Sequence, residues 1–171
     1  MRPLLACLSL SILTCFAHAQ LPDLPGPEKL QELKWLEGTW TGKTTFKMDG
    51  NEAPVKLSLV FSMESQFLKC VSLFDFEQIH MKETMYVGYD DEKKSFFAYT
   101  FSNFAAQPRV EHGDFVSDAL TLISDPWNVM GNSMTSRTVI KKVSDTKATM
   151  SVEFKVDDKW DQALSAELAK S

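Results

Sequence analysis

Residues 55–64 read VKLSLVFSME, and this stretch shows most directly how the chain folds. Apolar side chains occupy every second position, and most of the positions between them are polar. Successive side chains of a β-strand point to opposite faces, so a period of two predicts a strand with one buried face. Residues 148–156 alternate in the same way. We therefore expect Phe61 and Phe154 to point inward and Ser62 to point outward.

Most of the chain between these two stretches has the same character. We expect further strands, separated by turn residues, at Trp40–Met48, Phe67–Phe76, Ile79–Tyr89, Ser95–Ser102, Arg109–Phe115, Ala119–Ser124 and Met134–Val143. The last segment, Lys159–Ser171, is either an alanine-rich helix or a closing strand with Trp160, Gln162, Leu164, Ala166 and Leu168 on one face. About ten short strands without intervening helices predict a sandwich or an up-and-down barrel, and they exclude a parallel nucleotide-binding sheet.

A linker and a short helix are predicted before the first strand. Proline and glycine crowd residues 22–27, where neither a strand nor a helix interior can form, so we expect a proline-rich linker at 20–28. Residues 28–36 place leucine at every third position, which predicts a short helix with one apolar face.

The first residues have the features of a signal peptide. Arg2 supplies a positive start, Leu4–Phe16 is apolar, and Ala17-His18-Ala19 is typical of a cleavage site. The apolar run is shorter than the roughly 20 residues of a transmembrane helix. We therefore expect a signal peptide at 1–19, no membrane span, and a periplasmic or secreted protein. Lipid attachment at Cys15 is an alternative, but the preceding Thr14 fits such a site poorly.

Composition sets limits on fold and partners. Removal of residues 1–19 leaves 152 residues, enough for one domain with a real core. The formal charge of −5 becomes −6 when Arg2 is lost, and this acidic balance argues against nucleic acid or an anionic membrane as partner. Cys70 is then the sole cysteine, so an intramolecular disulfide is impossible. We interpret Cys70 as a buried apolar residue.

A motif at the start of the strand-rich region resembles a known family. Residues 33–42, LKWLEGTWTG, are similar to the opening of lipocalin-like barrels, in which a short helix leads into a Gly-x-Trp-x-Gly first strand. Within that group the chain resembles a bacterial family of unknown function and, more distantly, nitrobindin-type barrels. Tyr86–Asp90, Gly113–Phe115, Leu120–Leu122 and Arg137 follow in that family's order and spacing. The resemblance extends from Leu30 to about Leu168.

The resemblance implies an all-β fold: a roughly ten-stranded antiparallel lipocalin-like (calycin-type) barrel at residues 29–171, closed at one end by the short N-terminal helix. The physics of the motif agrees, because Trp40 is large enough to plug a small barrel. Gly38 and Gly42 let neighbouring backbone approach closely. We therefore assign structural roles to Gly38, Trp40 and Gly42.

A barrel of this size leaves an interior for one small ligand. Arg137 is flanked by two hydroxyl residues, Ser136 and Thr138. If its side chain points inward, it can bind a carboxylate or phosphate; if the side chain points outward, it closes a surface ion pair. Tyr86 and Tyr99 offer hydroxyls to the same ligand or serve as core or rim aromatics. Trp127 follows Asp125-Pro126 and either covers the rim or lines the ligand mouth. These four residues are our candidates for ligand binding.

The sequence gives no pattern for a cofactor, metal or catalytic site. In nitrobindin-type barrels a histidine near the final strands binds haem, but no histidine follows His112, so we expect neither haem nor another cofactor. Glu111 and His112 are strand neighbours that point to opposite faces, which argues against a shared metal ion. The serines have no glycine-elbow context, and Glu64, Glu83 and Glu111 belong to different predicted strands.

Three classes of function are compatible with these observations. The first is an exported barrel that binds a small, largely apolar ligand, with an acidic head group where Arg137 points inward. The second is an enzyme that acts on a small molecule in the same cavity. The third is an interaction protein with a solid barrel. The presence of a cavity separates the first two from the third.

The signal peptide leads to a direct prediction. The mature protein is expected to begin at Gln20, because small residues at 17 and 19 set the cleavage point. N-terminal sequencing of protein from its own host tests this. An intact Met1 or a lipid-modified Cys15 would contradict it.

Overall fold

The computed structural model describes residues 27–48, 50–129 and 131–171. The predicted signal peptide and residues 20–26 of the predicted linker lie outside this part of the chain. Among the described residues, no helix has the length and apolar character that crossing a membrane requires.

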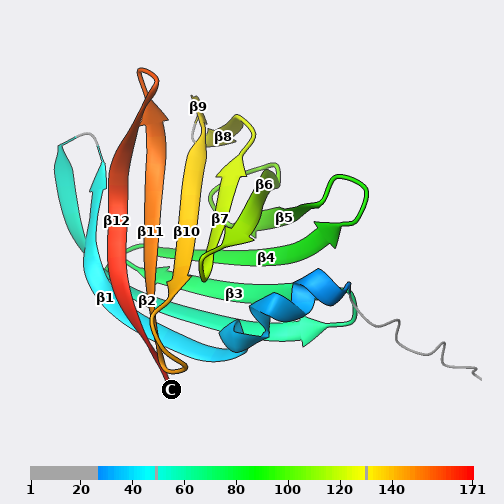
Figure 1. Ribbon diagram of the computed structural model, residues 1–171. Helices are drawn as coiled ribbons and strands as arrows, with labels where there is room; N and C mark the ends of the chain where they lie inside the picture. The colour runs from blue at the N-terminus through cyan, green and yellow to red at the C-terminus, as the bar shows by residue number, and fades with distance from the viewer. Residues whose placement is uncertain (1–26, 49, 130) are drawn as a thin grey trace, which may run out of the picture.

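Ten antiparallel strands of the described chain close into a barrel (Figure 1). They are β1 (Gly38–Met48), β2 (Asn51–Glu64), β3 (Phe67–Asp75), β4 (His80–Asp90), β5 (Ser95–Ser102), β6 (Arg109–Val116), β7 (Ala119–Ser124), β10 (Ser136–Lys142), β11 (Lys147–Val156) and β12 (Lys159–Lys170). Neighbours along the chain pair with each other, β7 pairs with β10, and β1 pairs with β12 to close the ring. The predicted fold class is confirmed.

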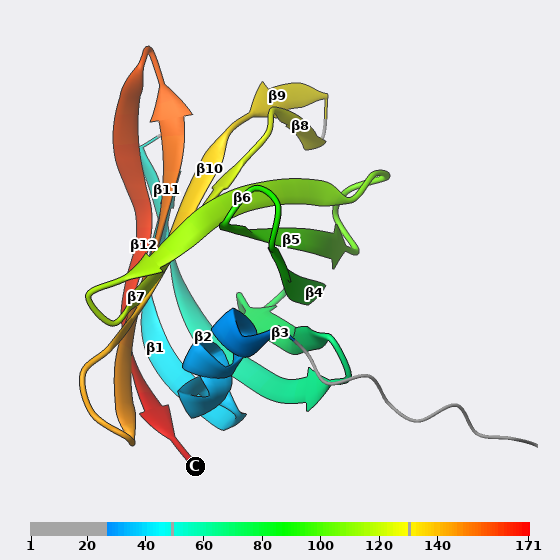
Figure 2. The same ribbon diagram turned by 45° about the vertical axis from the view of Figure 1, so that its right-hand side comes forward.

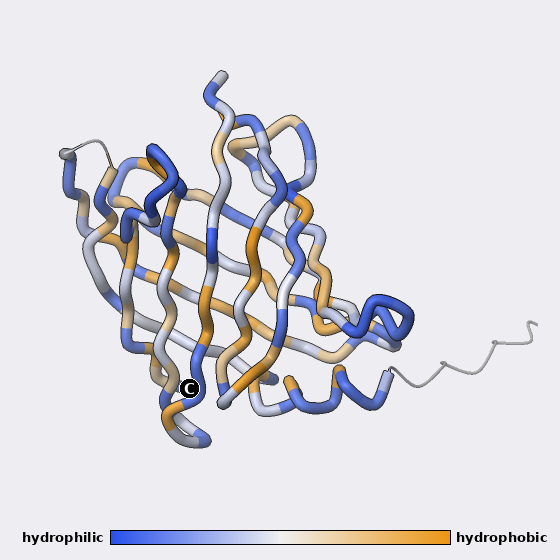
Figure 3. Tube along the Cα trace, turned by 45° about the horizontal axis from the view of Figure 1, so that its top comes forward, coloured by the Kyte–Doolittle hydropathy of each residue, from blue (hydrophilic) through white to orange (hydrophobic). Residues whose placement is uncertain are grey.

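Period-two alternation places the side chains as expected along most strands. In β2, Val55, Leu57, Leu59 and Phe61 are buried, and Val60 on the other face is exposed. The same alternation is visible as changes of hydropathy along neighbouring strands in Figure 3. The inner face therefore supplies both the core and the wall of any cavity.

A 3-10 helix, η1 (Glu28–Leu36), covers one end of the barrel (Figure 2). Its three residues per turn bring Leu30, Leu33 and Leu36 onto one face, and all three are buried. Trp40 at the start of β1 is also fully buried. Its Nε1 donates a hydrogen bond of 2.6 Å to the carbonyl oxygen of Leu36. These residues fill the barrel end beneath the helix.

The two glycines around Trp40 lie where a side chain would not fit. Gly38 has φ of +113°, in the region that favours glycine. A Cβ on Gly42 would lie 2.6 Å from the carbonyl oxygen of Glu167 on β12. Gly42 therefore permits the close approach of β1 and β12 where the barrel closes.

The last segment is a strand, so the helical alternative is wrong. The predicted single inward face is also only partly right. Leu164, Ala166 and Leu168 are buried, but a bulge interrupts the pairing of β12 with β11 beside Ala163. The bulge inserts one residue, and beyond it Trp160 lies on the outer face.

A short hairpin, β8 (Trp127–Val129) and β9 (Asn132–Met134), lies between β7 and β10. The sequence predicted a strand-ending turn at 125–128 and a single strand from Met134 onward. Instead the hairpin rises at the end of the barrel opposite η1 (Figure 2). It stands at the mouth of the cavity described below.

The register of β2 leads to a stability prediction. Phe61→Ala is expected to lower the free energy of unfolding by about 3–5 kcal/mol, because Phe61 is 3% exposed and packs inside the barrel. Ser62→Ala, on the outer face, is expected to change it by less than about 0.5 kcal/mol. Denaturant melts measure both. The reverse order would show that the register of β2 is shifted by one residue.

Candidate functional site

The barrel encloses a cavity of about 520 Å³ in the half opposite η1. Trp40 and the leucines of η1 fill the other half, so the cavity opens where β8 and β9 stand. Most of its lining is apolar, including Phe46, Phe61, Phe74, Phe76, Phe104, Trp127, Met150 and Phe154. This volume lies within the range typical of small-molecule sites, roughly 300–1,000 Å³.

The inner wall has a polar side and an apolar side. The buried polar residues among those described are Ser72, Glu83, Thr100, Glu111, Ser124, Ser136 and Thr138. They lie on β3–β7 and β10, and several are cross-strand neighbours: Ser72 pairs with Glu83, and Glu111 pairs with Ser124. Strands β11, β12, β1 and β2 line the cavity with apolar residues. Of the buried polar residues, Ser72, Glu83 and Thr138 line the cavity, among apolar neighbours such as Phe74 and Met85.

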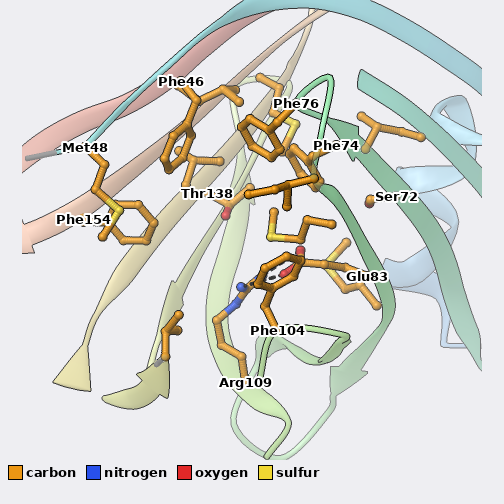
Figure 4. Close-up of a pocket in the computed structure, with 18 of the residues that line it drawn as sticks. Phe46, Met48, Ser72, Phe74, Phe76, Glu83, Phe104, Arg109, Thr138 and Phe154 are labelled. Atoms are coloured by element: carbon orange, nitrogen blue, oxygen red, sulfur yellow. Dashed lines mark hydrogen bonds and ion pairs between the residues drawn. The ribbon is translucent and has the colours of Figure 1, made fainter. Parts of the chain in front are cut away.

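Arg109 is the centre of the polar side. Its Nη1 and Nη2 lie 3.3 and 3.5 Å from the carboxylate oxygens of Glu83, and its Nε lies 3.2 Å from Oε2 of Glu111. Figure 4 shows Arg109 reaching from β6 toward Glu83 on β4, with Phe104 beside them. The indole ring of Trp127 stacks on the guanidinium with 4.9 Å between Cζ and the ring centroid. We call Glu83, Arg109 and Glu111 the buried ion cluster.

Burial and the neighbouring carboxylates shift the pKa of Arg109 in opposite directions. Burial lowers the pKa of Arg109, but the carboxylates of Glu111 and Glu83 raise it by more, so it lies above its ordinary value. The guanidinium is therefore charged at any physiological pH. Glu111 Oε2 accepts a hydrogen bond of 2.8 Å from Thr100, whereas its Oε1 has no hydrogen-bond partner among the described groups.

The comparisons with known proteins agree with this architecture. The family model "Protein of unknown function (DUF1579)" matches residues 25–170. The chain belongs to the DUF1579 family. This confirms the predicted resemblance to a family of unknown function. No curated protein is significantly similar to the chain.

A solved structure supports the fold of this DUF1579 protein. The crystal structure of Rv2717c from M. tuberculosis matches with a TM-score of 0.63 and 15% sequence identity. The match covers 85% of this chain and 99% of that chain. At such low identity the likeness extends to the fold alone.

Arg137 does not reach the cavity. It lies on the outer face of β10, where its Nε pairs with Glu153 and its guanidinium stacks on Trp160, 4.6 Å from Cζ to the ring centroid. Of the two alternatives for Arg137, the outward side chain that closes a surface ion pair is therefore correct, and the inward one that binds a ligand is wrong. Ser136, Thr138 and Ile140 are the buried residues of this strand.

The other candidate residues divide between the two faces. Tyr86 contacts Phe67 and Lys69 outside the barrel, and Tyr99 is 45% exposed, so neither lines the cavity. Trp127 does line it, and its Nε1 has no hydrogen-bond partner among the described groups. The structure thus brings one of the four predicted ligand residues to the cavity.

The buried ion cluster was not predicted. Glu83 and Glu111 belong to different predicted strands, but both carboxylates contact Arg109. A signal was present in Arg109-Val110-Glu111, because residues two apart on a strand share a face. His112 lies on the outer face, as its position next to Glu111 predicted.

Reactive groups at the cavity are few. Burial raises the pKa of the Cys70 thiol to about 12, against a smaller lowering by its contact with Ser72, so the nucleophilic thiolate is absent at neutral pH. Among the described residues, no group of three or more His, Cys, Asp or Glu side chains is arranged to hold a metal ion.

The two arginines that stack on tryptophan form a matched pair for experiment. Arg109→Met is expected to lower the free energy of unfolding at pH 7 by about 3–5 kcal/mol, because two buried carboxylates lose their counter-ion. Arg137→Met removes a partly exposed ion pair and is expected to cost about 1 kcal/mol or less. Urea melts of both variants measure the difference. Equal costs would show that the buried ion cluster is solvated.

Proposed function

We propose that this protein is an exported binding protein that holds a small, largely apolar molecule inside its barrel. The observation that carries the proposal is the cavity of about 520 Å³, open at one end and lined mainly by apolar side chains, of which phenylalanine and methionine are the most frequent. Burial of apolar surface supplies roughly 25 cal/mol per Å², so such a lining favours an apolar ligand. Export rests on the signal peptide predicted at 1–19.

The arrangement of the barrel supports binding over the alternatives. A solid barrel would present no interior, whereas this one leaves space equal to a small-molecule site. For an enzyme with a thiol nucleophile, Cys70 is unsuitable, because burial keeps its thiol protonated. An acidic head group at Arg137 finds no support, because that guanidinium lies outside the barrel.

A neutral fluorescent probe tests the proposal. N-phenyl-naphthylamine, whose emission rises in apolar surroundings, is expected to saturate the mature protein with one site. Ala53→Trp places an indole into the cavity from β2 and is expected to weaken binding about tenfold or more.

The control is the neighbouring residue on the opposite face of the same strand. Glu52 is exposed and forms a surface ion pair with Lys47, so Glu52→Trp is expected to leave the affinity within about twofold. A wild-type protein that does not bind the probe would refute the proposal. So would equal effects of the two variants, because binding would then lie outside the cavity.

A further inference from the structure

The charged groups around the cavity carry more negative than positive charge. Glu83 and Glu111 share the single guanidinium of Arg109, and the three side chains are only 10%, 1% and 12% exposed. Glu77 adds a carboxylate at the mouth. Among the lining residues that the structure describes, only Arg109 is positively charged. Charges interact strongly where water is excluded, so this excess favours a cation and opposes an anion.

Of the two carboxylates in the buried ion cluster, Glu83 is among the residues that line the cavity and Glu111 is not. The contacts between Arg109 and Glu83, 3.3 and 3.5 Å, are longer than the roughly 2.7–2.9 Å of strong charge-assisted hydrogen bonds. A carboxylate held so loosely can accept a further N–H donor. A ligand that supplies N–H groups to Glu83 therefore adds charge-assisted hydrogen bonds there.

Aromatic rings also line the cavity, one of them beside Glu83. Phe76, Phe104 and Trp127 line the cavity, and Figure 4 shows Phe104 beside the contact of Arg109 with Glu83. The Trp127 ring already holds one cation, the Arg109 guanidinium. Aromatic faces combined with excess negative charge are the features that bind ammonium groups by cation–π attraction and ion pairing.

From these three observations we infer that the cavity selects a positively charged amine attached to an apolar body and rejects the corresponding carboxylate. The amine lies at Glu83 and the adjoining aromatic rings, and the apolar body packs against β11, β12, β1 and β2. This inference rests on the proposed function and names its ligand class.

The test uses three probes with one apolar body and different polar ends. Naphthylethylamine, naphthylethanol and naphthylacetate are titrated at neutral pH into protein loaded with N-phenyl-naphthylamine, and displacement gives each affinity. The amine is expected to bind about tenfold more tightly than the alcohol, and the carboxylate more weakly than both.

Two variants separate the local carboxylate from overall charge. Glu83→Gln keeps the shape of the side chain and is expected to reduce the amine-to-alcohol ratio to about one, while raising the affinity for the carboxylate. Glu167→Gln makes the same change of charge on the exposed outer face of β12 and is expected to leave the ratio unchanged. Binding of the neutral probe shows that each variant keeps its cavity.

The possible results distinguish this inference from the proposed function. If the neutral probe binds but the alcohol or the carboxylate is preferred, the amine inference is wrong and the proposed function stands. An amine preference that survives Glu83→Gln, or that falls equally with Glu167→Gln, also overturns the inference. If the neutral probe and all three ligands fail to bind, both proposals are wrong.

Discussion

The hydrogen bond from the Trp40 indole to the Leu36 carbonyl joins the N-terminal helix to the barrel, and the position of the cavity depends on it. A closed barrel has two open ends, and side chains must fill at least one of them to form a core. Here Trp40 and three leucines of η1 fill one end. Nearer the other end, the inward-facing side chains line the cavity. The hairpin of β8 and β9 borders this cavity.

The buried ion cluster is costly for a protein whose stability could come from apolar packing alone. Removing two carboxylates and a guanidinium from water has a large desolvation penalty, and an apolar replacement of such a group is often neutral or stabilising. Ser124 and Ser136 extend the same polar side through hydrogen bonds of 2.8 and 3.2 Å. From this polar side Ser72, Glu83, Arg109 and Thr138 line the cavity, where the proposed ligand would contact them.

The fold was largely predictable from the sequence, because period-two alternation of apolar and polar residues indicates which face of each strand is buried. The choice between barrel and sandwich came from the resemblance at residues 33–42, since alternation alone does not decide which strands close the sheet. The errors have local causes. The face of Arg137 was left open because each face of its strand carries one large apolar residue, Val139 on the side of Arg137 and Ile140 on the other. The bulge beside Ala163 has no such signal, because it depends on the pairing with β11.

The proposed ligand contacts both the polar and the apolar residues of the cavity lining. Glu83 already accepts two hydrogen bonds from Arg109, and an amine adds a further donor that a purely apolar ligand lacks. A purely polar ligand would instead leave Phe46, Met150 and Phe154 unable to exchange water for apolar contacts. The proposed amphipathic amine contacts both kinds of lining at once. Since Glu83 and Arg109 lie on β4 and β6, and Phe46 and Phe154 lie on β1 and β11, the proposal also predicts the orientation of such a molecule.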